Sequence, residues 1–143
     1  MVFKINISTK DGKTFKVELD SESLVGKELG QTIQGSDINA DLTGYELLIT
    51  GTSDKSGFMG SEDVEGIGLK KLLFGVGKGM WTKPKGDKKK NKRTKKGLRL
   101  RKTVRGKVIS DAITQINTKV TKDGAKPLAE IFASEIKAPE ASA

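Results

Sequence analysis

The stretch VFKINISTKDGKTFKVEL, residues 2–19, decides the fold class of this chain. Apolar and polar side chains alternate on both sides of a central Lys-Asp-Gly-Lys sequence, a pattern typical of β-strands with one buried face. Asp11-Gly12 supplies the positive-φ residue that a tight turn needs, so the sequence predicts a β-hairpin. The apolar positions are Val2, Phe3, Ile5, Ile7, Phe15, Val17 and Leu19, and the opposite face carries Lys4, Asn6, Lys16 and Glu18.

Glycines divide the following part of the chain into short segments, 17 of them in 143 residues. Residues 20–43 favour short barrel strands and corners, with one helical turn near Ser23, because closely spaced glycines disfavour a long helix. Residues 45–51 are predicted to form a buried strand that ends at Gly51. A glycine-rich loop is expected over residues 52–68.

Strand patterns return on both sides of the most basic part of the chain. The sequence LKKLLF begins a strand at Leu69, and residues 103–110 alternate again. Residues 113–120 fit the same pattern if a bulge lies near Gln115. Many short strands and few helical patterns predict a mainly β fold, a single antiparallel β-barrel-like domain over residues 1–136.

The C-terminal part contains the best helix candidate, residues 125–137. Leu128, Ile131, Phe132 and Ile136 share a helical face there, and a strand followed by a turn is the alternative. Residues 137–143 are small and polar, so we expect a disordered tail.

A short repetition links the two ends of the chain, since the sequence Thr-Lys-Asp-Gly occurs at residues 9–12 and again at residues 121–124. Lys-Asp-Gly is common turn chemistry, which favours two hairpin tips. A duplicated half-barrel is the other reading.

The charge of the chain is distributed very unevenly. The net charge is +9, and 14 of the 27 Lys and Arg residues lie between Lys83 and Lys107, together with one acid, Asp87. The remainder holds 13 basic and 17 acidic residues, so a mildly acidic domain carries one intensely basic segment. Fourteen cations against one acid exceed what solubility requires, and the segment has no apolar stripe with which to enter a membrane interface.

Phosphate is the natural partner of this basic segment, residues 83–107, because each contact releases counterions condensed on nucleic acid. Arginine adds a planar fork that binds phosphate through two hydrogen bonds. In GLRLRKTVRG, Leu98 and Leu100 alternate with Arg99 and Arg101, which predicts a strand that re-enters the sheet with one cationic face. The candidate nucleic-acid-binding residues are Lys83, Lys85, Lys88, Lys89, Lys90, Lys92, Arg93, Lys95, Lys96, Arg99, Arg101, Lys102 and Arg105.

Trp81 is the only tryptophan and borders the basic segment. It could stack on a base or sugar, but packing against the rim of a barrel is the more common role for such a residue.

Composition argues against catalysis. The chain has no His and no Cys, which removes the usual general base, thiolate nucleophiles and the commonest metal ligands. The glycine-rich sequence around Lys78 lacks the Ser or Thr that a phosphate-binding P-loop requires after its lysine, and the acids at Glu62, Asp63 and Glu65 lack the spacing of a calcium loop. We therefore expect no catalytic residue, no metal, no cofactor and no small-molecule substrate. No apolar run approaches the ~20 residues of a membrane span.

Several motifs occur in an order and spacing that resemble the S6e family of small-subunit ribosomal proteins, found in archaea and eukaryotes. The most specific are GTSDKSGF, residues 51–58, and RKTVRG, residues 101–106, and the resemblance extends from Phe3 to about Ile131. The chain looks like the short archaeal form, without the long basic tail of the eukaryotic members after Ala143.

The resemblance implies a β-rich body bound to ribosomal RNA, with ribosomal proteins as neighbours, in the cytoplasm. The RNA contacts that it implies come from Arg101, Lys102 and Arg105, and from residues 88–96 as the basic loop. This loop departs from the family pattern, being longer and dominated by lysine. Two other functions stay open from the residues: a regulatory RNA- or DNA-binding module outside the ribosome, and an enzyme that acts on nucleic acid with a carboxylate-bound metal.

Overall fold

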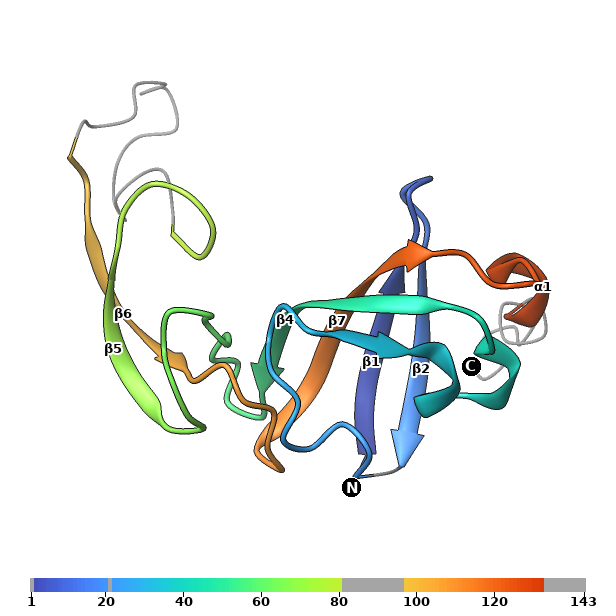
Figure 1. Ribbon diagram of the computed structural model, residues 1–143. Helices are drawn as coiled ribbons and strands as arrows, with labels where there is room; N and C mark the ends of the chain where they lie inside the picture. Colours follow the sequence, from blue (N-terminus) through green and yellow to red (C-terminus); the bar gives the residue numbers. More distant parts are fainter. Residues whose placement is uncertain (1, 21, 81–96, 133–143) are drawn as a thin grey trace, which may run out of the picture.

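The computed structural model describes residues 2–20, 22–80 and 97–132, and Figure 1 shows their arrangement. Strands β1 (Val2–Ser8) and β2 (Thr14–Asp20) form an antiparallel pair in which Ser8 lies opposite Thr14. Gly12, in the turn, has a φ of 81°, which a residue with a side chain rarely adopts. The predicted hairpin is confirmed.

The hairpin belongs to a five-stranded sheet with the strand order β2-β1-β7-β4-β3. The other strands are β3 (Thr32–Gln34), β4 (Glu46–Asp54) and β7 (Ile113–Lys122). The mainly β fold class is therefore confirmed, and the sheet curls into a half-barrel (Figure 1). The sheet is mixed rather than purely antiparallel, because β1 and β7 run parallel. Alternation reveals which side chains are buried but not the direction of a neighbouring strand, so the sequence did not reveal this pair.

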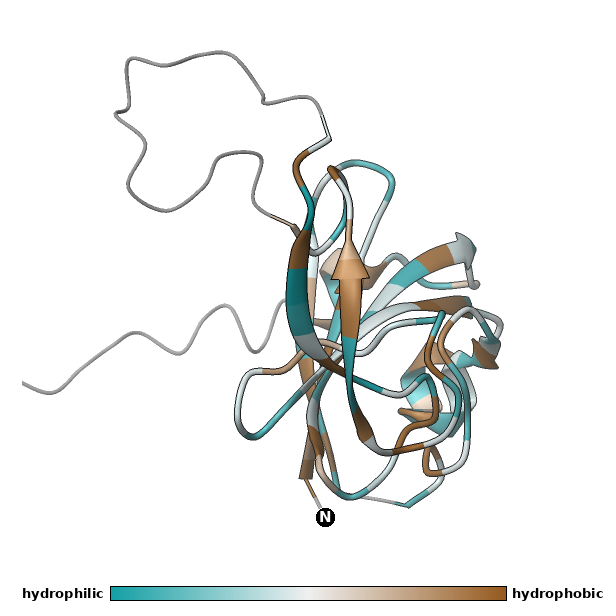
Figure 2. Cartoon of the chain, turned by 90° about the vertical axis from the view of Figure 1, so that its left-hand side faces the viewer, coloured by the Kyte–Doolittle hydropathy of each residue, from teal (hydrophilic) through white to brown (hydrophobic). Residues whose placement is uncertain are grey.

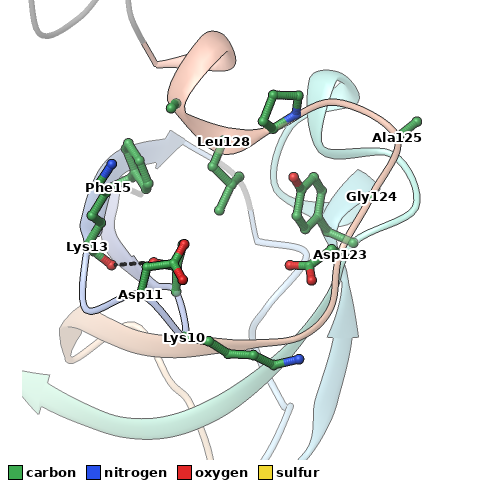
Figure 3. Close-up of a pocket in the computed structure, with 12 residues that line it drawn as sticks. Lys10, Asp11, Lys13, Phe15, Asp123, Gly124, Ala125 and Leu128 are labelled. Carbon is green, nitrogen blue, oxygen red and sulfur yellow. Dashed lines mark hydrogen bonds between the residues drawn. The ribbon is translucent and has the colours of Figure 1, made fainter.

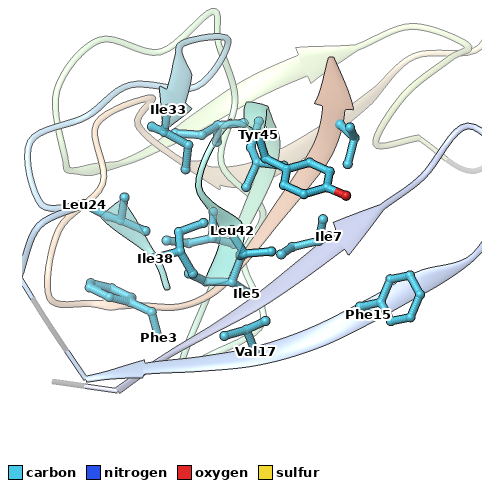
Figure 4. Close-up of a cluster of buried hydrophobic side chains, with 14 of the residues drawn as sticks. Phe3, Ile5, Ile7, Phe15, Val17, Leu24, Ile33, Ile38, Leu42 and Tyr45 are labelled. Carbon is cyan, nitrogen blue, oxygen red and sulfur yellow. The ribbon is translucent and has the colours of Figure 1, made fainter. Parts of the chain in front are cut away.

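The core lies in the concave side of the half-barrel, where Figure 4 shows side chains from β1 and β2 pointing toward those of the loops that follow. Phe3, Ile5 and Ile7 are fully buried, as the alternation predicts. Two short 3₁₀ turns, η1 (Gly35–Asp37) and η2 (Ala40–Leu42), contribute to the wall. The helical turn expected near Ser23 is not found there, where the structure has hydrogen-bonded turns but no helix.

Strand β4 passes through Gly51 instead of ending there, which corrects the predicted boundary. Gly51 pairs with Asn117, and the register shifts between Ile49 and Gly51, so the glycine sits at an irregularity within the strand. The bulge predicted near Gln115 is confirmed. Ser53 pairs with Gln115 and Asp54 with Ile113, which leaves Thr114 as the extra residue of β7.

A second sheet, which we call the ribbon, consists of β5 (Leu69–Phe74) and β6 (Leu100–Arg105) in antiparallel register. It stands beside the half-barrel (Figure 1). The strand predicted from the Leu-Arg alternation thus exists, but it joins this separate two-stranded sheet and not the main one. Strand patterns carry no information about the partner strand.

The described C-terminal part contains one short helix, α1 (Leu128–Ile131), within the range predicted as helical. Phe132, directly after it, stacks on Phe15 of β2 with ring centroids 5.3 Å apart, and so closes one end of the core. The remaining predicted helical residues and the predicted disordered tail, 137–143, lie outside the described residues. No helix in the described ranges is long and apolar enough to cross a membrane.

The two Thr-Lys-Asp-Gly sequences lie at the same end of the sheet, because the parallel strands β1 and β7 lead into them. Figure 3 shows Lys10 and Asp11 of the first facing Asp123 and Gly124 of the second across a cavity of about 460 Å³. The first is a hairpin tip, as predicted. The second leads from the end of β7 to α1, and no strand follows it among the described residues, which end at Phe132. The structure therefore favours neither a second hairpin tip nor a duplicated half-barrel.

Candidate nucleic-acid interface

Two predicted RNA-binding arginines are exposed: Arg101 within β6, and Arg99 directly before this strand. In the register of the ribbon Arg101 lies opposite Leu73, and the next pair on the same face joins Thr103 to Lys71. Residues two apart on a strand point to the same side. This exposed face of the ribbon therefore carries Arg101 and Lys71 together, from two strands that the sequence separates by about 30 positions.

Lys102 points to the opposite face of the ribbon. Its Nζ donates a hydrogen bond of 2.9 Å to the carbonyl oxygen of Gly79, in the loop that follows β5. The same face contains the buried Val104. Lys102 thus ties the loop after β5 to β6, a positioning role that the sequence did not predict.

Arg105 is the last residue of β6, and its side chain is also engaged within the protein. Nε and Nη2 each lie 3.0 Å from Oδ2 of Asp54, and Nη1 donates a hydrogen bond of 3.1 Å to the carbonyl of Ile67. The side chains of Arg105 and Asp54 are 16% and 2% exposed, so this ion pair is largely shielded from water. An arginine held this way buttresses the ribbon against the half-barrel.

Backbone hydrogen bonds hold the Asp54 carboxylate in place for its contact with Arg105. Its Oδ1 accepts hydrogen bonds of 2.8 Å from the backbone N–H groups of Ser56 and Phe58. Burial alone would raise the pKa of the Asp54 carboxyl, but the hydrogen bonds from Phe58, Arg105 and Ser56 and the charge of Arg105 together lower the pKa below its ordinary value. The carboxylate is therefore ionised at neutral pH.

The surroundings of Gly106, the final residue of the RKTVRG motif, explain why this position needs a glycine. A Cβ at this position would lie 1.8 Å from the carbonyl oxygen of Gly66. The N–H of Gly106 also donates to the carbonyl of Gly68, so residues 66–68 and residue 106 cross at backbone contact distance. This crossing and the Arg105–Asp54 pair together fix the base of the ribbon.

Most of the predicted site lies outside the described residues. These are Trp81, Lys83, Lys85, Lys88, Lys89, Lys90, Lys92, Arg93, Lys95 and Lys96. By chain order they connect the loop after β5 to the start of β6, and the structure leaves their contacts as predictions.

Two acidic residues of the predicted glycine-rich loop, Glu62 and Asp63, make local contacts. Lys78 Nζ lies 3.6 Å from Glu62 Oε1, and Asp63 accepts a long hydrogen bond from Ser61. Within the described ranges no three potential metal-ligating side chains gather into a group. The pairing of Asp54 with Arg105 was missed because the sequence places the two residues about 50 positions apart. The Asp-x-Ser-Gly turn signal at residues 54–57 was the only hint.

Comparison with known proteins agrees with this architecture. A family profile described as ribosomal protein S6e matches residues 3–133. The chain is 44% identical over 136 residues to the small ribosomal subunit protein eS6 of Methanosphaera stadtmanae, with 93% of this chain and 94% of the relative covered. The proteins of the same name from Nanoarchaeum equitans and Archaeoglobus fulgidus are each 41% identical, covering 92% of this chain and 90% and 96% of theirs. This chain belongs to the ribosomal protein S6e family.

Proposed function

We propose that this protein is a structural component of the small ribosomal subunit in the cytoplasm, and that it binds ribosomal RNA through the basic segment, residues 83–107. Membership of a family of ribosomal structural proteins, which are not enzymes, supports the ribosomal role. Neighbouring ribosomal proteins are its other partners. The protein neutralises phosphate repulsion where RNA helices approach each other and so stabilises a folded RNA arrangement.

The observation that carries the RNA contact is the concentration of 14 cations and one acid in a single segment of an otherwise mildly acidic chain. The described end of this segment supports it, because Arg101 is exposed on β6, whose position is fixed at its base, and Arg99 is exposed directly before that strand. Among the candidate residues, Arg99, Arg101 and those of residues 83–96 face the RNA in this proposal. Lys102 and Arg105 position the ribbon through their contacts with Gly79 and Asp54.

Salt dependence of binding tests the proposal. Purified small-subunit ribosomal RNA is titrated with the wild-type protein and with a triple variant, Lys88→Gln, Lys89→Gln and Lys90→Gln, at several salt concentrations. Each lost phosphate contact lowers the slope of log K against log salt by roughly 0.7–0.9. A control triple variant, Lys13→Gln, Lys16→Gln and Lys119→Gln, removes the same charge from exposed positions of the half-barrel.

The basic-segment variant should lose affinity and slope while the control changes little. Equal losses in both variants would reduce the effect to net charge and contradict a localised interface. A regulatory module outside the ribosome is the competing function, and sedimentation separates the two. A ribosomal component remains with the small subunit after a high-salt wash, whereas a free module is released.

A further inference from the structure

The ribbon exposes apolar side chains that its own fold does not cover. Of six exposed large apolar residues within the described ranges, four lie on or beside β5: Ile67, Leu69, Leu73 and Val76, each about half exposed. Figure 2, which views the molecule from the ribbon side, shows apolar and hydrophilic segments alternating along the two front strands. An exposed apolar patch of this kind marks an interaction site more often than a scattered single residue does.

The register of the ribbon places these leucines among cations. Leu73 lies opposite Arg101, and Leu69 and Lys71 follow on the same side of β5 at intervals of two residues. Neighbours on one face of a strand are about 7 Å apart. The opposite face holds Val104, Leu72 and Phe74. Of these, Val104 is buried, and Leu72 and Phe74 are partly covered. The exposed face of the ribbon therefore carries Leu69, Lys71 and Leu73 on β5 and Arg101 on β6. Arg105, opposite Leu69 at the base of this face, is paired with Asp54.

The charge of the ribbon and its surroundings indicates the kind of partner that its exposed face can bind. Between residues 66 and 105 the only acid is Asp87, so the occupant of the exposed face is an anion. β6 also lies within the basic segment, residues 83–107, so the ribbon and the rest of this segment can share one polyanion. Phe74, the one aromatic residue of the two strands, lies on the covered face, so the exposed face offers no aromatic platform for the bases of single-stranded RNA.

We propose that the exposed face of the ribbon docks on the minor groove of an RNA duplex, with Leu69 and Leu73 against riboses and Lys71 and Arg101 on the flanking phosphates. The minor groove of A-form RNA is wide and shallow and presents 2′-hydroxyls and base edges. A low, two-stranded surface can enter it, and short aliphatic side chains can pack there without base stacking. This inference rests on the proposed function and adds a second, partly apolar contact to it.

The test separates apolar from ionic contributions. A Leu69→Ser and Leu73→Ser double variant removes the apolar contact, so it should lower affinity for purified small-subunit ribosomal RNA at least fivefold. Because it removes no charge, it should leave the salt slope unchanged. A Lys71→Gln and Arg101→Gln double variant should lower both affinity and slope. Val2→Ser, at an equally exposed apolar position of β1, is the matched control and should bind like wild type.

A second measurement does not depend on a destabilising change. A photoreactive phenylalanine analogue at position 73 should crosslink to double-stranded segments of the RNA, and the same analogue at position 2 should not. Wild-type protein that fails to bind the RNA contradicts the proposed function itself. Normal RNA binding by the leucine variant, without crosslinks from position 73, overturns only the inference. Loss of subunit retention with normal RNA binding would assign the face to a neighbouring protein and also overturn it.

Discussion

Arg105 and Asp54, the last residues of β6 and β4, are joined by an ion pair of 3.0 Å that links the ribbon to the half-barrel. The two strands belong to different sheets, so this contact couples the position of the exposed arginines to the core of the protein.

Replacing Arg105 with Ala should lower the free energy of unfolding by roughly 3–5 kcal/mol, because it leaves the carboxylate of Asp54 shielded and without its cation. Arg101→Ala, at an exposed position of the same strand, should change stability by less than about 0.5 kcal/mol. Urea unfolding measures both. The RNA salt slope should respond in the reverse order, falling for Arg101→Ala and staying near wild type for Arg105→Ala under conditions where that variant is folded. A larger slope change for Arg105→Ala would contradict its structural assignment.

The acid sensitivity of the fold should depend on Asp54. Because the pKa of its carboxyl is lower in the folded state, the carboxylate stabilises the protein above the unfolded-state pKa of about 4. That contribution is lost as the pH falls through the folded-state pKa. Asp54→Asn should be less stable at neutral pH and should lose less stability on acidification below about pH 4. Glu18→Gln, at an exposed position, is the control, and an acid profile of Asp54→Asn that parallels it would contradict the prediction.

Gly106→Ala should destabilise the protein by roughly 1–3 kcal/mol, because the added methyl group would meet the backbone of Gly66. Gly68→Ala is a matched control two residues further along the crossing segment, where a Cβ meets nothing within 4 Å. Thermal unfolding of both variants measures the difference. Equal melting temperatures of the Gly106→Ala and Gly68→Ala variants would contradict the prediction, because they would show that the backbone crossing can widen without loss of stability.

Thr114→Val should stabilise the protein by about 1 kcal/mol, because the buried Oγ1 at the β7 bulge has no hydrogen-bond partner among the described residues. Thr118, on the same strand, is the informative contrast. Its hydroxyl donates a hydrogen bond of 3.1 Å to the carbonyl of Asn6. Thr118→Val should therefore destabilise by a similar amount, and the two valine variants should shift the urea midpoint in opposite directions.

Local patterns were sufficient for the main strands of this fold, but not for all of their boundaries. The alternation in residues 2–19 predicted the hairpin and its buried face, and the phase change near Gln115 predicted the bulge. Both depend on neighbouring residues in one strand, where side-chain periodicity is informative. Gly51 misled the prediction because glycine ends many strands, yet here it accommodates a register shift within β4.

Long-range relationships were out of reach. The parallel pairing of β1 with β7 and the separation of the ribbon from the main sheet depend on which edges meet in space. The candidate site was also predictable only in part. Charge density predicted a cationic surface that includes Arg99 and Arg101. The inward assignment of Lys102 and Arg105 required knowledge of Gly79 and Asp54, residues distant in sequence.

The pairing of β1 with β7 also limits when the half-barrel can fold during synthesis. Asn6 and Asn117, which share a hydrogen bond across these strands, are 111 positions apart, so the half-barrel cannot close until nearly the whole chain has been synthesised. Contacts of such long sequence separation form slowly, because the loop between them must first be closed. The cationic residues 83–107 leave the translating ribosome before β7 does. Nascent chains therefore carry this charge before they have a finished core. Under the proposed function, newly made protein captured on RNA should include incompletely folded molecules.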